Sequence, residues 1–283
     1  MNPSLQVAFD RGLSALPPAL QPVAAAQWLE WQPLLAALPE SDPSWAQSAA
    51  RVLACSEFVA RTGATRAGLL ADLLQSGDLH RRCDRAEWAG RARAAVSGCA
   101  DEAQLKSALR ALRGRAMVRI AWRDLAGWAG LDETLADLSS LADACLEAAL
   151  ASLHGWAVTR EGVPIEQSSG SAARFVVLGM GKLGGEELNF SSDIDLLFTY
   201  SDEGETDRRG LSNHEFFVRL GQRLINVLQD QTGDGFVFRV DMRLRPNGAS
   251  GPLALSFDAM EQYYQAHGRM WERYALIKAR VVA

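Results

Sequence analysis

Apolar residues recur every three or four positions along roughly the first 160 residues, and this spacing predicts amphipathic helices. The clearest runs span residues 28–38, 69–74, 105–120 and 135–153. Asp132 is a suitable N-cap for the last of these helices, and Gly155 is expected to end it. The pattern therefore predicts an all-helical region at the N-terminal side of the chain.

The spacing changes after a stretch rich in glycine, proline and serine between Arg160 and Ala173. Strands are predicted at residues 174–178, 194–200 and 236–244, with helices at 212–229 and 256–283. The predicted fold class is α+β, in which a helical region (1–165) precedes a core of mixed sheet and helices (166–283).

Composition narrows the class of protein. The chain has 283 residues, 48% hydrophobic and 22% charged, with a formal net charge of −5, which excludes collagen-like, disordered and disulfide-scaffold chains. It has no secretory signal pattern and no run of about 18 apolar residues, so we expect a cytoplasmic protein without a membrane span. The four cysteines are widely spaced and are expected to be reduced.

Arginine dominates the basic residues, because lysine occurs only at Lys106, Lys182 and Lys278. The arginines between Arg110 and Arg123 are expected to line solvated helix faces or to pair with acids, although a nucleic-acid-binding stripe is the alternative. Mild net acidity argues against a nucleic-acid partner. The tryptophans of the first half are expected to pack in cores or between helices.

A glycine-rich turn follows the first predicted strand. Its sequence is Gly179-Met180-Gly181-Lys182-Leu183-Gly184, with the spacing of a dinucleotide-binding turn. A strand follows within a dozen residues, where a Rossmann unit would place a helix. A P-loop is excluded because Gly185 is followed by Glu186 instead of Lys and Ser or Thr. We call Gly179–Gly185 the glycine loop.

Two acids, Asp193 and Asp195, begin the next predicted strand and project from one face of it. Adjacent like charges are costly without a cation between them, and Mg²⁺ prefers carboxylate oxygens. The alternative is a pair of solvated aspartates. A third acid, Asp241, is predicted to share a strand face with Arg239, Arg243 and Arg245, either as another metal ligand among phosphate-binding groups or as part of a surface salt-bridge ladder.

The glycine loop, the Asp-x-Asp strand and the later single-Asp strand together resemble polymerase-β-like nucleotidyltransferases. The run from Val177 to Leu196 is similar to the signature of bacterial bifunctional glutamine synthetase adenylyltransferase/adenylyl-removing enzymes. Further similar blocks are Arg119–Leu125, Arg239–Pro246, Gly251–Leu253 and Trp271–Arg280. Members of that family carry two nucleotidyltransferase modules in tandem. This chain resembles the first, adenylyl-removing module, and we expect it to be truncated because no second such motif appears.

The resemblance implies that Asp193, Asp195 and Asp241 are catalytic and bind Mg²⁺. The candidate phosphate- or nucleotide-binding residues are Gly179, Gly181, Lys182, Gly184, Gly185, Ser192, Arg243 and Arg245. The lysine and arginine roles are inferred from their charge, and a turn or cap role for Ser192 is the alternative.

The implied reaction is attack of inorganic phosphate on AMP bound to a glutamine synthetase tyrosine, which releases ADP. The implied partners are glutamine synthetase, a PII-type signal protein, inorganic phosphate and ADP or ATP. Two alternatives remain. The first is AMP transfer from ATP to glutamine synthetase, and the second is a non-catalytic regulatory fragment of a larger enzyme.

Overall fold

The computed structural model describes residues 3–38, 44–190, 193–233 and 235–283. The chain folds into two compact units. The helical unit comprises Met1–Cys83 with Arg113–Thr134, and the sheet unit comprises Asp84–Leu112 with Leu135–Ala283. Every described strand lies after residue 165, where the sequence predicts the division between the helical region and the mixed core. As a domain boundary that division stays a prediction.

The helical unit is built around buried aromatic side chains. Its helices are α1 (Pro3–Ser14), α2 (Gln21–Glu30), α3 (Gln32–Ala37), α4 (Ser44–Cys55), α5 (Glu57–Thr65), α6 (Ala67–Gln75) and the second half of α8 (Glu102–Leu125). Trp45 contacts both Trp28 and Trp122, with ring centroids 6.1 Å apart in each pair. All three rings are buried, as expected from the sequence for tryptophans of this half.

Three arginines of α8, Arg110, Arg119 and Arg123, are buried, so the expectation of a solvated face was wrong for them. The alternative expectation, pairing with an acid, is confirmed for Arg123. The Arg119 side chain is inaccessible to solvent and donates to the backbone carbonyl oxygen of Asp78 at 3.1 Å. Arg123 donates to Glu133 at 2.6 Å and to the Leu79 carbonyl oxygen at 2.7 Å. A buried guanidinium needs acceptors for its N–H groups, and these carbonyl and carboxylate oxygens provide them. Arg119 and Arg123 are therefore part of the core of the helical unit.

The sheet unit contains the first half of α8, most of α9 and every described strand. Its helices are α7 (Arg85–Val96), the first half of α8, α9 (Leu131–Glu161, from Leu135 on), α10 (Gly181–Gly184), α11 (Asn213–Gln229), α12 (Phe257–Ala266) and α13 (Met270–Ala275), with short 3₁₀ turns at Gly248–Ser250 and Leu276–Lys278. Helix α9 continues six residues beyond the stop predicted at Gly155, because an exposed helical glycine weakens a helix without ending it.

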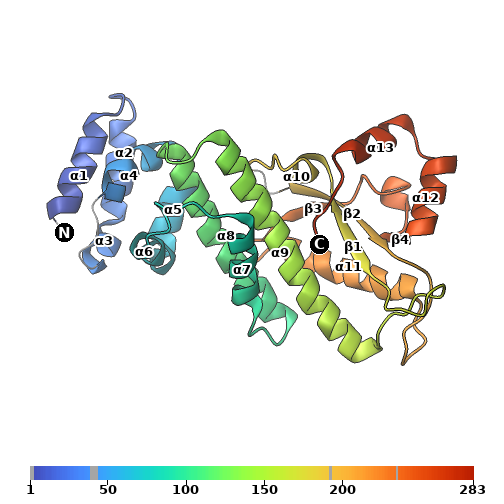
Figure 1. Cartoon of the computed structure of the whole chain (residues 1–283). Helices are drawn as coiled ribbons and strands as arrows, with labels where there is room; N and C mark the ends of the chain where they lie inside the picture. Colours follow the sequence, from blue (N-terminus) through green and yellow to red (C-terminus); the bar gives the residue numbers. More distant parts are fainter. Residues whose placement is uncertain (1–2, 39–43, 191–192, 234) are drawn as a thin grey trace. The chain divides into compact units, whose positions relative to one another are not determined.

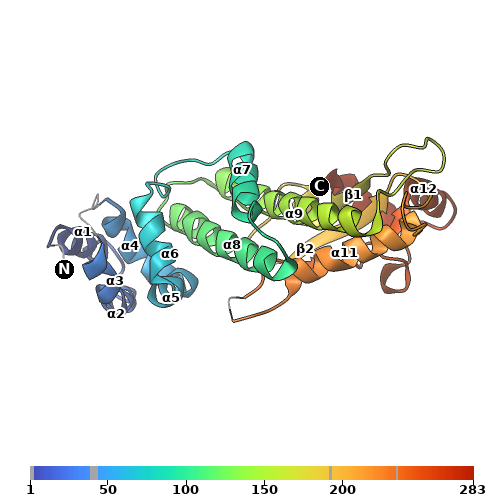
Figure 2. The same ribbon diagram turned by 90° about the horizontal axis from the view of Figure 1, so that it is seen from below.

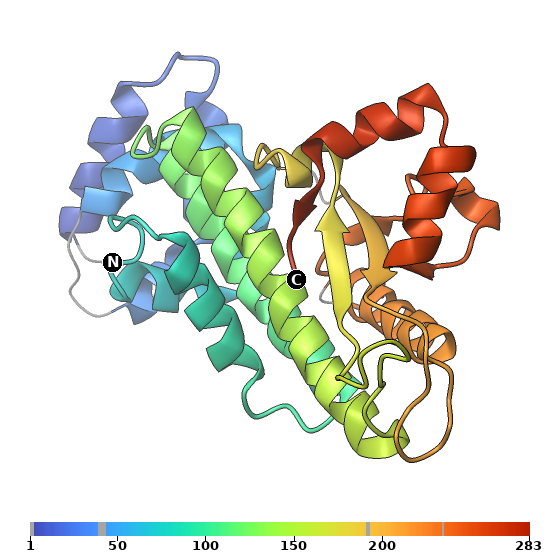
Figure 3. The ribbon, with the colours of Figure 1, turned by 45° about the vertical axis from the view of Figure 1, so that its right-hand side comes forward.

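In the described residues the strands are β1 (Phe175–Gly179), β2 (Asp193–Tyr200), β3 (Arg239–Asp241), β4 (Ala254–Ser256) and β5 (Arg280–Val281), and they form one sheet of five. Strand β2 runs antiparallel to β1 and parallel to both β3 and β4 (Figure 1). Strand β5 joins β1 at the other edge, on the side where α9 runs (Figure 3). The predicted α+β class with a mixed sheet is confirmed.

The two faces of β2 have different chemistry. Alternation places Phe198 toward α11, which runs along the strands (Figure 2), and the Phe198 ring packs against Gly221 of that helix. Phe217 of α11 stacks on Phe175 of β1, with ring centroids 5.4 Å apart. Asp193 and Asp195 therefore project from the opposite face of the sheet, away from α11.

The strand predicted over residues 236–244 is much shorter. Strand β3 ends at Asp241, whose carboxylate accepts a hydrogen bond from the backbone N–H of Arg243 at 2.8 Å. Such a local bond competes with the strand ladder and starts a turn. The prediction that Arg243 and Arg245 share a strand face with Asp241 was therefore wrong.

The helix predicted through residues 256–283 was also wrong at its end. After α13 and a 3₁₀ turn the chain becomes extended, and Arg280–Val281 pairs with Leu178–Gly179 of β1. Val282 completes this edge by donating its backbone N–H to the Val177 carbonyl oxygen at 2.9 Å. The C-terminal residues thus reinforce the strand that leads into the glycine loop.

Two further findings concern the general character of the chain. The four cysteines carry free thiols, and Cys145 is buried while Cys55 is exposed. Within the described ranges, no helix combines the length and apolarity that crossing a bilayer requires.

The surroundings of two glycines, Gly184 in the glycine loop and Gly155 in α9, predict opposite effects on stability when each is replaced by alanine. A Cβ on Gly184 would overlap the Lys278 carbonyl oxygen and lie 2.5 Å from that of Gly179, whereas Gly155 has open space around it. Gly184→Ala should lower the free energy of unfolding by about 1–3 kcal/mol. Gly155→Ala should raise it by about 0.5–1 kcal/mol, because alanine favours a helix. Urea denaturation of both variants tests this, and a neutral Gly184→Ala would contradict the packing.

Candidate active site

Parallel pairing of β2 with β3 brings the three candidate acids together. Asp195 stands in register with Asp241, and Asp193 stands in register with Arg239. Residues in register share a face of the sheet, and neighbouring strands are about 4.8 Å apart, so Asp195 and Asp241 are adjacent. Asp193 lies two residues before Asp195 on the same face.

Two of these acids hold arginines. Arg239 Nε donates to Asp193 Oδ1 at 2.6 Å. Arg243 Nε donates to Asp241 Oδ2 at 2.8 Å, and hydrogen bonding by Arg243 lowers the pKa of Asp241. The sequence pattern predicts that Arg239 lies near the acids, but it does not predict which acid Arg239 contacts. That contact follows from the pairing of β2 with β3, which places Arg239 opposite Asp193.

Among the three acids, Asp195 is the one whose negative charge is least offset by nearby cations. Burial raises its pKa, and the charges of Asp241 and Asp193 raise it further, while Arg243 and Lys182 oppose the shift. The Asp195 side chain is half-buried beside two other carboxylates. This site therefore has a surplus of negative charge centred on Asp195, which a cation would relieve.

The glycine loop lies directly against Asp195. The backbone N–H of Met180 donates to the Asp195 carbonyl oxygen at 2.9 Å. Gly181 has φ +52°, and a Cβ there would lie 2.8 Å from Asp195 Oδ2, so this position requires glycine. Lys182 Nζ is exposed at the same loop and lies 3.5 Å from Asn189 Oδ1. The structure thus brings Gly181 and Lys182 to the acids.

The other candidate residues have different surroundings. Gly179 and Gly184 pack closely against neighbouring protein atoms, and Gly185 lies near the Lys278 and Glu187 side chains. Arg245 donates to the carbonyl oxygens of Met242 at 2.8 Å and Ala249 at 3.0 Å, so its guanidinium supports the loop after β3. Ser192 lies outside the described residues.

The donor set fits a hard divalent cation. Carboxylate oxygens are the ligands that Mg²⁺ prefers, and the excess charge at Asp195 favours a cation there. In the parts of the chain that the structure describes, however, no three acidic, histidine or cysteine side chains are arranged as a metal site. A metal ion at Asp193 Oδ1 or at either Asp241 carboxylate oxygen would compete with the arginine that donates to that oxygen.

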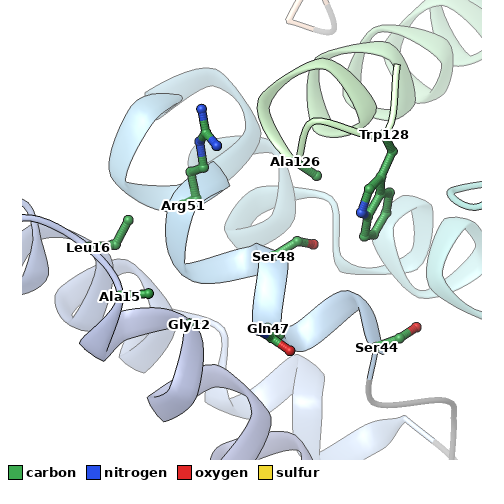
Figure 4. A pocket seen from close by; sticks show the side chains of 9 residues that line it. All are labelled: Gly12, Ala15, Leu16, Ser44, Gln47, Ser48, Arg51, Ala126 and Trp128. Carbon is green, nitrogen blue, oxygen red and sulfur yellow. The ribbon is translucent and has the colours of Figure 1, made fainter. Parts of the chain in front are cut away.

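A separate cavity in the helical unit has a different character. It has a volume of about 440 Å³ and is lined by α1, α4 and the segment after α8 (Figure 4). Of its described lining residues only Arg51 is charged, beside neutral groups such as Ser48 and Trp128. It therefore lacks the acids that the candidate chemistry needs.

The sequence matches one family profile, described as glutamate-ammonia ligase adenylyltransferase, over residues 46–283. Similar proteins include the bifunctional glutamine synthetase adenylyltransferase/adenylyl-removing enzymes of Thioalkalivibrio sulfidiphilus, 57% identical over 240 residues, and Nitrosococcus oceani, 54% identical over 234 residues. The matched segments cover 84% and 82% of this chain. The corresponding enzyme of Pseudomonas putida is 48% identical over 277 residues, or 95% of this chain.

These matches cover only a part of each relative. The aligned segment amounts to 25% of the Thioalkalivibrio protein, 24% of the Nitrosococcus protein and 28% of the Pseudomonas putida protein. The chain therefore spans about a quarter of the length of the curated relatives that it matches.

The charge arrangement predicts shifts of opposite sign in the pKa of Asp195. Asp241→Asn removes a like charge, so the pKa of Asp195 should fall; Lys182→Met removes an opposite charge, so it should rise. Carboxyl ¹³C NMR titration in the presence of a chelator measures both. Shifts of the same sign, or no shift in either variant, would contradict the arrangement.

Proposed function

Because this chain belongs to the glutamate-ammonia ligase adenylyltransferase family, we propose that its sheet unit removes AMP from an adenylylated tyrosine of glutamine synthetase by phosphorolysis. The observation that carries the proposal is the set of three acids on one sheet face, with the glycine loop against Asp195. The names of the relatives, which include both adenylyl transfer and adenylyl removal, support this class of chemistry.

In the proposed reaction an oxygen of inorganic phosphate attacks the phosphorus of the tyrosyl-AMP diester. A new P–O bond forms, the bond from phosphorus to the tyrosine oxygen breaks, and the products are ADP and tyrosine after the phenolate takes a proton. The phenol has an ordinary pKa of about 10, so it is a fair leaving group without a strong general acid.

Two anions must meet in this reaction, so the site has to offer positive charge. Lys182 extends from the glycine loop, and Arg243 reaches the acids from the turn after β3. We propose that both bind phosphate oxygens, since guanidinium and ammonium groups are the usual partners of phosphate. Arg245 is a weaker candidate because backbone carbonyl oxygens engage its guanidinium.

Asp193, Asp195 and Asp241 are the residues that would hold Mg²⁺. When bound, this ion would offset negative charge on the reacting phosphates. The protein's own contribution is to keep three carboxylates on one face of the sheet, where the pairing of β2 with β3 fixes the positions of their backbones.

Adenylyl transfer from ATP to glutamine synthetase is the second candidate function, because the same acids serve the chemically related transfer and the relatives' names include it. A third candidate is a regulatory fragment that binds glutamine synthetase or a PII-type signal protein without turnover. Glutamine synthetase is the proposed protein substrate of the first two functions, and either protein is the proposed partner in the third.

Substitution of Asp195 tests the proposed reaction. Asp195→Asn should slow phosphate-dependent ADP release from adenylylated glutamine synthetase at least about a hundredfold, because the central charge of the site is lost. Chromatographic measurement of ADP with Mg²⁺ and phosphate present gives the rate. Asp10→Asn, an exposed acid of α1, is the matched control and should leave the rate unchanged.

The outcomes of this experiment separate the candidates. Equal rates for Asp195→Asn and the wild-type chain would reject the assignment of the site. A mass gain on glutamine synthetase tyrosine from ATP, without ADP release from the adenylylated form, would favour adenylyl transfer. Binding of glutamine synthetase without either reaction would favour the regulatory fragment.

The arginine pairing predicts how metal affinity responds to substitution. Arg243→Gln should tighten Mn²⁺ binding several-fold, because it leaves the Asp241 oxygens available, and Asp241→Asn should weaken it at least about tenfold. Electron paramagnetic resonance of free Mn²⁺ measures the affinity. Arg219→Gln breaks a similar exposed ion pair, to Glu215, and serves as control. Equal affinity in all these variants would contradict a metal site here.

A further inference from the structure

Arg280 contacts the glycine loop from the side opposite Asp195. It lies on β5 in register with Gly179, where the loop begins. Its Nη2 donates to the Leu183 carbonyl oxygen at 2.9 Å, and its Nε donates to the Gly184 carbonyl oxygen at 3.3 Å. Both acceptors belong to the last two residues of α10, and the Leu183 carbonyl oxygen also accepts from the Glu186 backbone N–H at 3.2 Å.

Asp143 of α9 fixes the orientation of the Arg280 guanidinium. Arg280 Nη1 donates to Asp143 Oδ2 at 2.7 Å, and Nη2 donates to Oδ1 at 3.2 Å, which makes a bidentate pair. Asp143 is buried, and the Arg280 side chain is only 22% exposed. A bidentate pair inside the protein restricts the arginine more than a surface ion pair does.

A second arginine ties the end of the loop to the same acid. Arg85, the first residue of α7, donates to Asp143 Oδ2 at 3.1 Å and also pairs with Glu186. Glu186 follows the loop with φ +55°, a conformation that a residue with a side chain rarely adopts. Arg280 Nε lies 3.6 Å from the Glu186 carboxylate as well. Three segments distant in sequence therefore converge on the loop.

The glycine loop also packs closely against Asp195 and against Lys278. A Cβ at Gly184 would overlap the Lys278 carbonyl oxygen, and one at Gly181 would lie against Asp195. The loop is held between β2, which carries the acids, and the segment that leads into β5. Arg280 therefore contacts, through the Leu183 and Gly184 carbonyl oxygens, the same loop that carries Gly181 and Lys182 beside Asp195.

We propose that Arg280, oriented by Asp143, is a positioning residue that holds the glycine loop against the acids of the candidate active site. Neither side chain is assigned a contact with substrate. The effect on the loop follows from the contacts alone, whereas an effect on turnover also rests on the function proposed above.

Hydrogen exchange tests the positioning role without any substrate. The backbone N–H groups of residues 184–187 donate to carbonyl oxygens of residues 180–183, so their exchange reports opening of the loop. In Arg280→Met these amides should exchange at least about tenfold faster than in the wild-type chain. Arg280→Lys keeps the positive charge and one donor nitrogen in place of three, and should restore part of the protection.

Two further variants keep the test decisive. Asp143→Asn leaves Arg280 in place but removes the charge that orients it, so the same amides should exchange faster. This variant tests the proposal independently, in case Arg280→Met does not fold. Arg209→Met removes an arginine that pairs with Glu161 at 3.3 Å in the same unit, and should leave the loop amides unchanged. Wild-type exchange in Asp143→Asn, or equal acceleration in Arg209→Met, would overturn the proposal.

Kinetics then separates this proposal from the proposed function. Because Arg280 contacts the loop and is assigned no contact with substrate, Arg280→Lys should lower kcat for ADP release while KM for adenylylated glutamine synthetase stays unchanged. A raised KM with unchanged kcat would contradict positioning. An inactive wild-type chain would reject the proposed function, and the exchange result would still decide whether Arg280 and Asp143 hold the loop.

Discussion

In the parallel pair formed by β2 and β3, the carboxylates of Asp195 and Asp241 stand side by side on one face of the sheet. Like charges at this spacing repel, and burial adds to the cost, as the raised pKa of Asp195 records. The surrounding structure is arranged about this repulsion. Arg243 pairs with Asp241, the glycine loop carries Lys182, and aromatic side chains of α11 pack on the opposite face of the sheet. These cations offset the repulsion only in part, and Asp195 keeps the excess negative charge.

The arginine pairs have a consequence for chemistry as well as for stability. Asp193 and Asp241 each hold a guanidinium in this structure, so their oxygens are occupied by groups that also bind phosphate well. In the proposed reaction, a divalent cation bound to these acids would displace the arginines, which could then bind phosphate oxygens. Arg239 and Arg243 would then offset the negative charge of the acids before ligands bind, and that of phosphate afterwards. We propose that β5, through Arg280, holds the glycine loop and so determines the position of Lys182 relative to these acids.

Local sequence patterns were sufficient for the parts of the fold that depend on local periodicity. Strands β1 and β2 and helix α11 follow from their apolar spacing, and the acids on β2 follow from strand alternation. The pattern failed after Asp241, because the bond from the Arg243 N–H to the Asp241 carboxylate turns the chain although its residue types still alternate. It also failed at β5, where Arg280 pairs with a strand about a hundred residues earlier. The partners of Arg280 could not be predicted, since they depend on contacts among α7, α9 and the loop.

The proposed chemistry requires that Asp193, Asp195 and Asp241 form one cation-binding site at the glycine loop. The most direct measurement is anomalous diffraction from crystals of the chain grown with Mn²⁺ and ADP. We expect an anomalous peak within about 2–2.5 Å of carboxylate oxygens from all three acids. A peak at other residues, or none at these acids while ADP is bound, would contradict a shared site.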